Sequence, residues 1–369
     1  MELAPFWHGR RVLVTGHTGF KGAWLCLWLE KLGADVSAVA LAPDTAPSLY
    51  ALLAPWRGAQ HHIQDIRDLA RLREIFTAAA PEIVIHMAAQ ALVRPSYDDP
   101  VGTFETNLMG TVNVLEAARA CPSIKVILAV TSDKVYANDG HGRPFTETDA
   151  LGGNDPYSAS KACTELVCRS YHASFFKHRG VRLATARAGN VIGGGDWSKD
   201  RLVPDVVRAR EAGEPIALRY PDAVRPWQHV LDPLGGYLMY AEALARSAEG
   251  SLPPPALNFG PDELSSATVS EIAEALGKAE GLGDGRGEAW KQAPGTHAGE
   301  AALLKLDSAL ARRTLGWRPC LGLNDALAWT ADWYRANRAN TDMRAFSLAQ
   351  IAAYEKRRAT AGADPSEPA

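Results

Sequence analysis

Short apolar runs alternate with longer segments of helical spacing through the first half of the chain. The runs are continuous and rich in β-branched residues, as strands buried on both faces require. They comprise residues 12–14, 36–39, 83–85, 126–130 and 183–186. The segments between them place apolar residues three and four positions apart, which is typical of helices, and lie near 20–32, 67–79, 101–119 and 157–179. This alternation predicts an α/β fold whose parallel sheet has helices on both faces.

After about Arg187 the pattern changes to short elements, prolines and a glycine-rich stretch at 193–195. We expect a smaller second lobe there. The segment 228–260 contains another long helical run and a strand-like stretch from Ala256 to Phe259, so we expect it to return to the first lobe. The predicted division is 1–187 with the return at 228–260 for the first lobe, 188–227 and 261–355 for the second, and 356–369 for a mobile polar tail.

Composition narrows the functional classes. Hydrophobic residues make up 47% and charged residues 22% of the 369 residues, and the net charge is -3. This nearly neutral balance argues against a nucleic-acid partner. The five cysteines are an odd number without a C-x-x-C pair, which argues against a disulfide framework or a metal site. The apolar run 24–29 is too short for a membrane span, so we expect a cytoplasmic protein without a membrane partner.

A glycine loop directly follows the first predicted strand. Residues 15–22 read TGHTGFKG and lead at once into a helical pattern. A strand, a glycine loop and a helix N-terminus in this order are typical of a Rossmann-type fold that holds the pyrophosphate of a dinucleotide. The alternative is a glycine-rich turn that binds nothing. The residues expected at the cofactor are Gly16, His17, Gly19, Phe20, Lys21 and Gly22.

Further cofactor contacts are expected at the ends of later strands. Asp65 and Ile66 follow the third strand pattern and are candidates for the adenine end, although Asp65 can instead cap the next helix. An acid that binds the ribose hydroxyls of NAD commonly ends the second strand. Here that strand leads into residues 40–43, with Asp44 only afterwards, and no arginine stands there for a 2′-phosphate. We predict NAD. The fourth strand contributes Ala88, Ala89 and Gln90.

A candidate proton-transfer group follows the fifth strand. Ser132 stands at that strand's end, and Tyr157 and Lys161 are four residues apart on the next helix, so they share one face. A tyrosine that accepts a proton near neutral pH needs a nearby cation, because its ordinary pKa is about 10. Ser132 can bond the same substrate oxygen and relay the proton. Tyrosine and lysine at this spacing also occur by chance, but here they follow a dinucleotide loop in the expected order.

Together these motifs resemble the extended short-chain dehydrogenase/reductases, over about residues 7–351. More narrowly, the stretches HTGFKG, TSDK, RAGNVIGGGDW and RPWQHV are similar to those of CDP-glucose 4,6-dehydratases. The resemblance implies a hydro-lyase with bound NAD that acts on CDP-glucose. It further implies oxidation at C4, loss of water across C5–C6 and return of the hydride to C6, with no net redox change.

The resemblance assigns roles to two neighbours of Ser132. Asp133 is the candidate acid for the departing 6-hydroxyl group and Lys134 the candidate base at C5. The related dTDP-glucose dehydratases carry glutamate where Lys134 stands. A lysine base must be neutral, although its ordinary pKa is about 10.4, so we assign acid and base to the pair as a coupled unit. The alternative is that Lys134 forms a structural ion pair with Asp133.

Residues of the second lobe are expected to bind the nucleotide. Arg225 is the best diphosphate ligand because a guanidinium can bond two phosphate oxygens. Asn190 and Arg201 follow by resemblance, with a turn residue and a surface charge as their alternatives. Asn107 lies inside a helical run and, by resemblance, near the active site, where the resemblance makes it a cofactor contact together with Tyr157 and Lys161. Trp197 can stack on a base or fill core, and we favour core.

Two rival functions remain open. The first is 4-epimerisation, or dehydration of another nucleotide sugar, and epimerisation would not need Asp133 and Lys134 as acid and base. The second is an NAD-binding sensor without catalysis, which the intact Ser132, Tyr157 and Lys161 disfavour. A homodimer or larger homo-oligomer, formed through the helices near 101–119 and 157–179, is implied by the resemblance.

Overall fold

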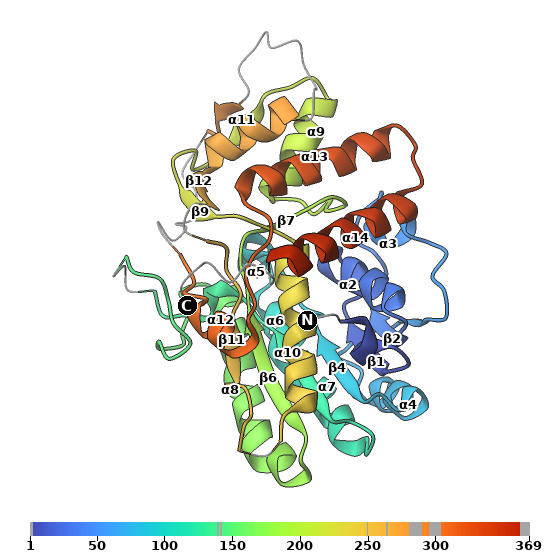
Figure 1. Cartoon of the computed structure of the whole chain (residues 1–369). Coiled ribbons are helices and arrows are strands. Elements are labelled where there is room, and N and C mark those ends of the chain that lie inside the picture. The colour runs from blue at the N-terminus through green and yellow to red at the C-terminus, as the bar shows by residue number, and fades with distance from the viewer. Residues whose placement is uncertain are drawn as a thin grey trace.

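The structure, a computed structural model, describes residues 3–138, 140, 142–248, 250–262, 265–279, 290–294 and 304–361. A parallel sheet of seven strands forms the centre, in the order β11-β6-β5-β4-β1-β2-β3 (Figure 1). Its strands are β1 (Arg11–Thr15), β2 (Asp35–Ala40), β3 (Gln60–Ile63), β4 (Ile83–His86), β5 (Val126–Val130), β6 (Arg182–Arg187) and β11 (Ala256–Asn258). The predicted α/β fold class with a doubly wound sheet is confirmed.

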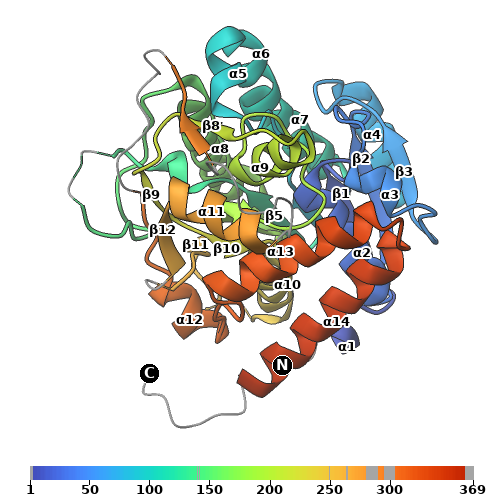
Figure 2. The same ribbon diagram turned by 90° about the horizontal axis from the view of Figure 1, so that it is seen from above.

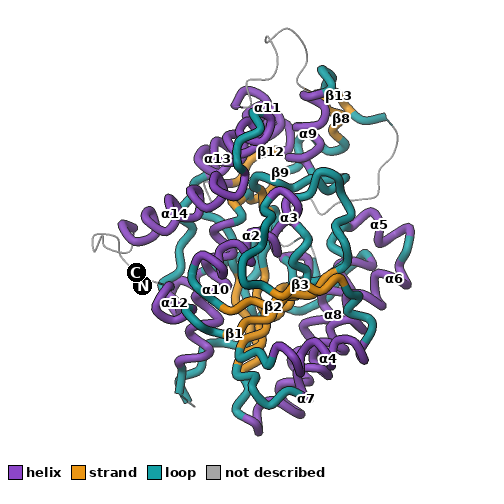
Figure 3. Tube along the Cα trace, turned by 90° about the vertical axis from the view of Figure 1, so that its right-hand side faces the viewer, coloured by secondary structure: helices purple, strands orange, loops and turns teal. Residues whose placement is uncertain are grey.

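Successive residues of the strands point to opposite faces of the sheet, so each face packs a separate core. Val12 and Val14 of β1 join one hydrophobic cluster and Leu13 joins the other. Figure 3 shows the sheet between α10 and α12 on one side and α4, α7 and α8 on the other. These helices span Leu231–Arg246 (α10), Ala309–Leu315 (α12), Leu69–Ala79 (α4), Gly110–Ala120 (α7) and Pro156–Tyr171 (α8), and α2 (Phe20–Lys31) follows β1.

The remaining elements of the sheet domain are short. Strand β3 lies where the third strand was expected before Asp65, but it is not an apolar run, because its sequence, QHHI, is polar and partly exposed at the sheet edge. The short helices are α1 (Ala4–Trp7), α3 (Leu49–Leu52), α5 (Val93–Asp98), α6 (Pro100–Phe104), η1 (Glu105–Met109), η2 (Asp133–Val135), η3 (His172–Phe176) and η4 (Lys177–Arg179).

A second group of elements lies over the carboxyl ends of the strands, at the top of Figure 1. Its helices are α9 (Leu202–Glu211), α11 (Val269–Ala279) and α13 (Leu323–Arg338). Three small sheets pair β7 (Val191–Ile192) with β10 (Gln228–His229), β8 (Ile216–Leu218) with β13 (Trp290–Gln292), and β9 (Val224–Pro226) with β12 (Ser266–Thr268).

The C-terminal part of the chain departs from the predicted division. Helix α14 (Met343–Ala361) contacts α2, and the Trp28 indole donates a 2.8 Å hydrogen bond to Glu355. Figure 2 shows α14 beside α2. The end of the predicted second lobe therefore packs on the first, because it covers apolar side chains of α2. The predicted tail is helical at 356–361, and 362–369 lie outside the described residues. The rest of the two-lobe division stays a proposal.

Candidate functional site

A cavity of about 1400 Å³ lies where the carboxyl ends of the central strands face the second group of elements. The glycine loop, the residues after β2 and β4, and the segment after β5 line one side. Residues of β7, α9 and β9 line the other. Ligands of open α/β sheets bind at this edge because the strand ends and helix N-termini converge there.

Close backbone contacts fix the conformation of the glycine loop. Gly16 has φ +83°, and a Cβ atom there would lie 2.7 Å from the Ala88 nitrogen. A Cβ at Gly22 would lie 2.1 Å from the Gly16 oxygen. Gly19 differs, because a Cβ there would meet nothing closer than 3.5 Å and the residue lines the cavity. No side chain caps the N-terminus of α2. The loop therefore leaves backbone N–H groups for a diphosphate, which fits NAD.

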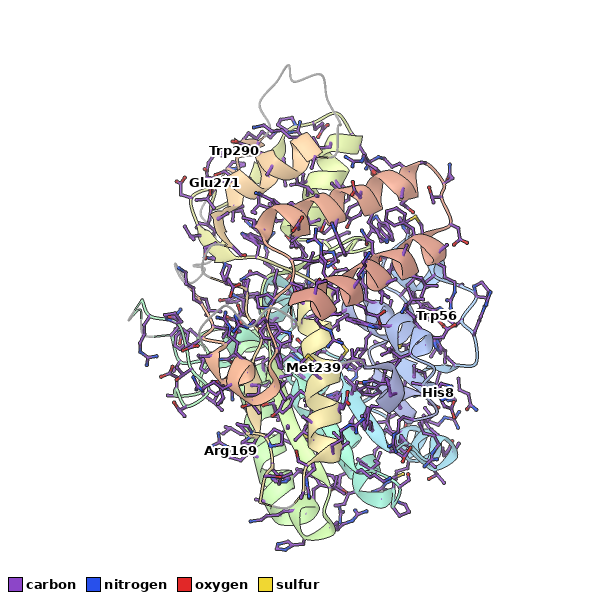
Figure 4. The ribbon with its side chains drawn as sticks, viewed as in Figure 1. His8, Trp56, Arg169, Met239, Glu271 and Trp290 are labelled. Carbon is purple, nitrogen blue, oxygen red and sulfur yellow. The ribbon has the colours of Figure 1, made fainter. Side chains whose placement is uncertain are left out.

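His17 departs from the prediction. Its ring is fully buried, does not line the cavity, and lies 4.5 Å from the His61 ring and 5.2 Å from the Tyr50 ring. Trp56, labelled in Figure 4, belongs to the same aromatic cluster and stacks on Tyr50 of α3, with ring centroids 5.3 Å apart. Burial, with the charge of His61, lowers the pKa of His17 to about 3, so its ring is neutral. The motif gave the position of His17 but not the direction of its side chain, which points into the core.

Both residues predicted at the adenine end line the cavity, as do Ala88, Ala89 and Gln90. The Asp65 carboxylate accepts a 2.8 Å hydrogen bond from the Arg67 backbone and a 2.7 Å hydrogen bond from the Arg67 guanidinium. Hydrogen bonding from Arg67 lowers the pKa of Asp65. The helix cap proposed as its alternative role belongs to Asp68, which accepts from the Arg71 nitrogen. Asp65 and Ile66 are therefore both available to a ligand.

Asp44 lines the cavity as well. The sequence does place this acid after β2, but four positions beyond the end of the strand. For that reason Asp44 was not expected to be the residue that binds the ribose. The Leu41 carbonyl, directly after β2, accepts a 2.8 Å hydrogen bond from the Thr18 hydroxyl of the glycine loop. Asp44 therefore lies at the same cavity edge as the glycine loop, where ribose hydroxyls of NAD are commonly bound.

Asn107 is 1% exposed and lies behind the cavity, in the π-helical turn η1. Its side-chain oxygen accepts from the Gln90 nitrogen at 2.8 Å, and its amide donates to the Gln90 oxygen at 3.0 Å. The amide also donates to the Ser160 hydroxyl at 2.8 Å. Asn107 therefore joins the loop after β4 to α8 and does not itself line the cavity. Its contact with the cofactor stays a prediction.

The structure brings Ser132, Tyr157 and Lys161 together at the cavity. Tyr157 is buried, and Ser132 lies close enough to affect its pKa. The Lys161 ammonium donates to the Val130 carbonyl at 3.3 Å. Burial raises the pKa of Tyr157, while Ser132 opposes this. Burial lowers the pKa of Lys161 to about 8. The group therefore has an acid–base tyrosine with a hydroxyl nearby and a lysine one helical turn away.

Asp133 and Lys134 line the same cavity. Asp133 is 5% exposed, accepts a 2.9 Å hydrogen bond from the Ser132 hydroxyl and packs against Gly189, where a Cβ would lie 1.9 Å from its carboxylate. Lys134 is half-buried. Among the described residues, Lys134 forms no ion pair with Asp133 within 4.0 Å. The structural ion pair proposed as the alternative is therefore not formed.

Asn190, Arg201 and Arg225 line the opposite wall. Asn190 has φ +49°, the left-handed conformation of a turn residue. Arg201 lies 3.5 Å from the buried Asp196 carboxylate, and Arg225 is 8% exposed in β9. Trp197 does not line the cavity and contacts Trp333 and Tyr334, with ring centroids 5.5 and 5.9 Å apart. It fills core, as favoured from the sequence.

Lys21 lies between the two walls. Its ammonium donates to the Tyr237 hydroxyl at 3.2 Å. Burial, with the charges of Arg201 and Lys161, lowers the pKa of Lys21 to about 7. These cations together give a positive potential suited to a diphosphate.

The described residues contain no group of three or more His, Cys, Asp or Glu side chains able to hold a metal ion. Of their helices, none has the length and hydropathy to cross a bilayer.

Comparison with known proteins decides the family. The model of the NAD dependent epimerase/dehydratase family matches residues 12–252. The chain belongs to this family. Membership confirms the predicted resemblance and the NAD dependence.

Individual family members are similar over nearly the whole chain. A CDP-glucose 4,6-dehydratase of Salmonella typhimurium is 44% identical over 354 residues, covering 95% of this chain and 97% of the relative. A dTDP-glucose 4,6-dehydratase of Xanthomonas campestris is 29% identical, covering 88% and 93%. The crystal structure of a dTDP-glucose 4,6-dehydratase from Streptomyces venezuelae with NAD bound has a TM-score of 0.76 at 26% identity, covering 90% and 98%. These relatives are hydro-lyases, as predicted for this chain.

Proposed function

We propose that the protein removes water from CDP-glucose and forms CDP-4-dehydro-6-deoxyglucose. The observation that carries this proposal is the meeting of Tyr157, Asp133 and Lys134 in one cavity, in a chain 44% identical to a CDP-glucose 4,6-dehydratase. When bound, NAD supplies the oxidant for C4 and the reductant for C6. The chain's own residues supply the proton transfers and the binding contacts.

Tyr157 accepts the proton of the sugar's 4-hydroxyl group, with Ser132 bonding the same oxygen. Because burial raises the pKa of Tyr157, the phenolate needs a cation close by. Lys161, four residues further on α8, is placed to supply it. With bound NAD as the acceptor of the hydride from C4, loss of the hydroxyl proton to Tyr157 would leave a 4-ketone. The ketone acidifies the proton on C5.

Asp133 and Lys134 then catalyse the elimination of water across C5–C6. Lys134 removes the C5 proton, and Asp133 gives a proton to the departing 6-hydroxyl group. For this step Asp133 must be protonated and Lys134 neutral. In the described part of the chain no ion pair within 4.0 Å joins their side chains. This supports two distinct roles, since an ion pair would hold both in the opposite protonation states.

The opposite wall of the cavity, which carries Asn190, Arg201 and Arg225, binds the nucleotide. Arg225 is held in a strand with its backbone paired to β12, so its guanidinium is presented to the diphosphate with little loss of side-chain freedom. Arg201 at the N-terminus of α9 and Asn190 complete this wall. On the cofactor side, we assign the diphosphate to the glycine loop, and the adenosine part to Asp65, Ile66 and Asp44.

A homodimer is proposed through α6, η1 and α8. The described residues include eight large hydrophobic side chains that are exposed, and five of them lie on or beside these elements: Tyr97, Val101, Met109, Leu166 and Phe175. Exposed apolar side chains gathered on adjoining helices mark association surfaces. We also propose a cytoplasmic location, with the five cysteines as free thiols.

The test is incubation of the purified protein and NAD with CDP-, dTDP-, UDP- and GDP-glucose, with the product identified by mass. We expect the 4-keto-6-deoxy product from CDP-glucose at the highest kcat/KM. Dehydration of a different nucleotide glucose alone would overturn the CDP assignment while the mechanism stands. NAD binding without any sugar product would instead favour a sensor.

The epimerase alternative is separated by two variants. We expect Asp133→Ala and Lys134→Ala each to abolish formation of the 4-keto-6-deoxy product. Interconversion of C4 epimers that survives both replacements would identify an epimerase.

A further inference from the structure

A buried ion pair lies directly behind residues 131–136, which we call the reactive segment. Arg187, at the end of β6, meets Glu165 of α8 through two 2.9 Å hydrogen bonds, one to each carboxylate oxygen. Their side chains are 1% and 4% exposed. In the described part of the chain neither lines the cavity, so the proposed reaction does not use them directly. Buried ion pairs seldom add much net stability, which points to another role for this one.

The Glu165 carboxylate holds the start of the reactive segment. The Thr131 hydroxyl donates to one of its oxygens at 2.6 Å, and Thr131 immediately precedes Ser132. Tyr157, Lys161 and Glu165 follow one another at intervals of four on α8, so they share one helix face. The face that carries the acid–base tyrosine therefore also anchors the segment opposite it.

The Arg187 guanidinium holds the end of the same segment. Its remaining nitrogen donates to the Tyr136 hydroxyl at 2.8 Å, and that hydroxyl donates to Asn258 at 2.7 Å. The Tyr136 ring stacks on Phe145, with centroids 4.8 Å apart. Tyr136 stands two residues after Lys134. Both ends of the stretch Ser132–Asp133–Lys134 are thus tied to one ion pair.

Both members of the ion pair also form hydrogen bonds with groups outside the reactive segment. The second Glu165 oxygen accepts from the Thr185 hydroxyl at 2.7 Å, and Arg187 also reaches the Glu147 carbonyl at 3.3 Å. Burial opposes ionisation of Glu165, but the hydrogen bonds and charge of Arg187 outweigh it, so the pKa of Glu165 lies below its ordinary value. A fully bonded buried network of this kind is rigid. It can therefore hold the reactive segment in a fixed position.

We propose that Glu165 and Arg187 are positioning residues that fix the reactive segment at both ends and so set the places of Ser132, Asp133 and Lys134 for proton transfer. This inference rests on the proposed dehydration of CDP-glucose. It predicts that loosening either end slows turnover and leaves substrate binding intact, because the nucleotide is bound by the opposite wall.

Two matched valine variants test it. Thr131→Val and Thr185→Val each remove one hydroxyl donor to the same carboxylate, but only Thr131 belongs to the reactive segment. We expect Thr131→Val to lower kcat by at least about tenfold, since a displacement of about 1 Å can slow a reaction about 100-fold. We expect Thr185→Val to keep kcat within about twofold. Binding of CDP-glucose, measured by calorimetry, should be unchanged in both.

Two further variants separate positioning from general loss of folding. Thr131→Ser keeps the hydroxyl and should restore kcat to near the wild-type value. Tyr136→Phe loosens the other end and should also lower kcat without changing the affinity for CDP-glucose. The melting temperature of each variant is measured alongside.

The outcomes are distinguishable from failure of the proposed function. If the wild type dehydrates CDP-glucose and Thr131→Val and Tyr136→Phe keep kcat within twofold, the positioning role is wrong. Equal losses of kcat in Thr131→Val and Thr185→Val, tracking their melting temperatures, also overturn it. A wild type that dehydrates no nucleotide glucose overturns the proposed function and this inference with it.

Discussion

The two ends of the cavity are built in different ways. At the glycine loop, the ligand surface is backbone: Gly16 and Gly22 allow contacts that a Cβ would forbid, and the α2 N-terminus supplies donors. At the sugar end, the surface is made of side chains from η2, α8 and β9. A backbone site is encoded within one short stretch, whereas a side-chain site is assembled from segments far apart in the sequence. Substitutions should therefore act on folding and cofactor binding at the first end, and on rate or substrate affinity at the second.

The largest effect is expected at the sugar end, from Tyr157→Phe. Removing the hydroxyl abolishes proton transfer from the 4-hydroxyl group, so kcat should fall by about 100- to 10,000-fold. The ring still fills its buried site. Initial rates of 4-keto product measure the loss, and NAD affinity should stay at the wild-type value. A kcat within tenfold of wild type would remove Tyr157 from the mechanism.

The glycine loop is tested by a matched pair. Gly22→Ala places a Cβ 2.1 Å from the Gly16 oxygen, so we expect a loss of about 1–3 kcal/mol in the free energy of unfolding. Gly19→Ala meets nothing closer than 3.5 Å in the protein and should change stability by less than about 0.5 kcal/mol. It should nevertheless weaken NAD binding. Denaturant unfolding and NAD titration separate the two, and equal stability losses would contradict this account of the loop.

A smaller effect is expected from Arg225→Lys. Lysine keeps the charge but loses the bidentate geometry, so KM for CDP-glucose should rise about tenfold, equivalent to about 1.4 kcal/mol of binding, with kcat nearly unchanged. Steady-state kinetics measure both constants. An unchanged KM would show that Arg225 does not bind the diphosphate.

The smallest effect concerns pH. The pKa of Lys161 is lowered to about 8 by burial, so its ammonium is present below pH 8 and is lost as the pH rises through this value. We expect kcat to decline above about pH 8. Stability should not fall for the same reason: the unfolded lysine keeps its proton up to a higher pH, so deprotonation in the folded state favours folding there. A pH profile of kcat beside thermal unfolding checks both directions.

The same contrast explains what the sequence could predict. The α/β class, six of the seven sheet strands and the glycine loop are encoded locally, in apolar runs and in closely spaced glycines. The apolar pattern did not mark strand β3 or predict helix α14, because the positions of both depend on packing partners elsewhere in the chain. The direction of the His17 side chain cannot be read from a motif, and its ring turned inward to Tyr50 and His61.

The positioning pair was missed for a related reason. Glu165 continues the four-residue spacing of Tyr157 and Lys161, and Arg187 is the last residue of strand β6, directly after an apolar run. Both signals are weak alone, because acids are common on helices and arginine is common at strand ends. Only the fold brings the two within hydrogen-bonding distance and shows that they bond to Thr131 and Tyr136.

The central claim is that Asp133 and Lys134 carry out an elimination across C5–C6. The most direct measurement is turnover of CDP-glucose in D₂O, with the product analysed by mass spectrometry and NMR at early times. The account predicts a product lighter by one water and carrying one solvent deuterium at C5, because the C5 proton is removed and later replaced from solvent. A product of unchanged mass without deuterium at C5 would contradict it.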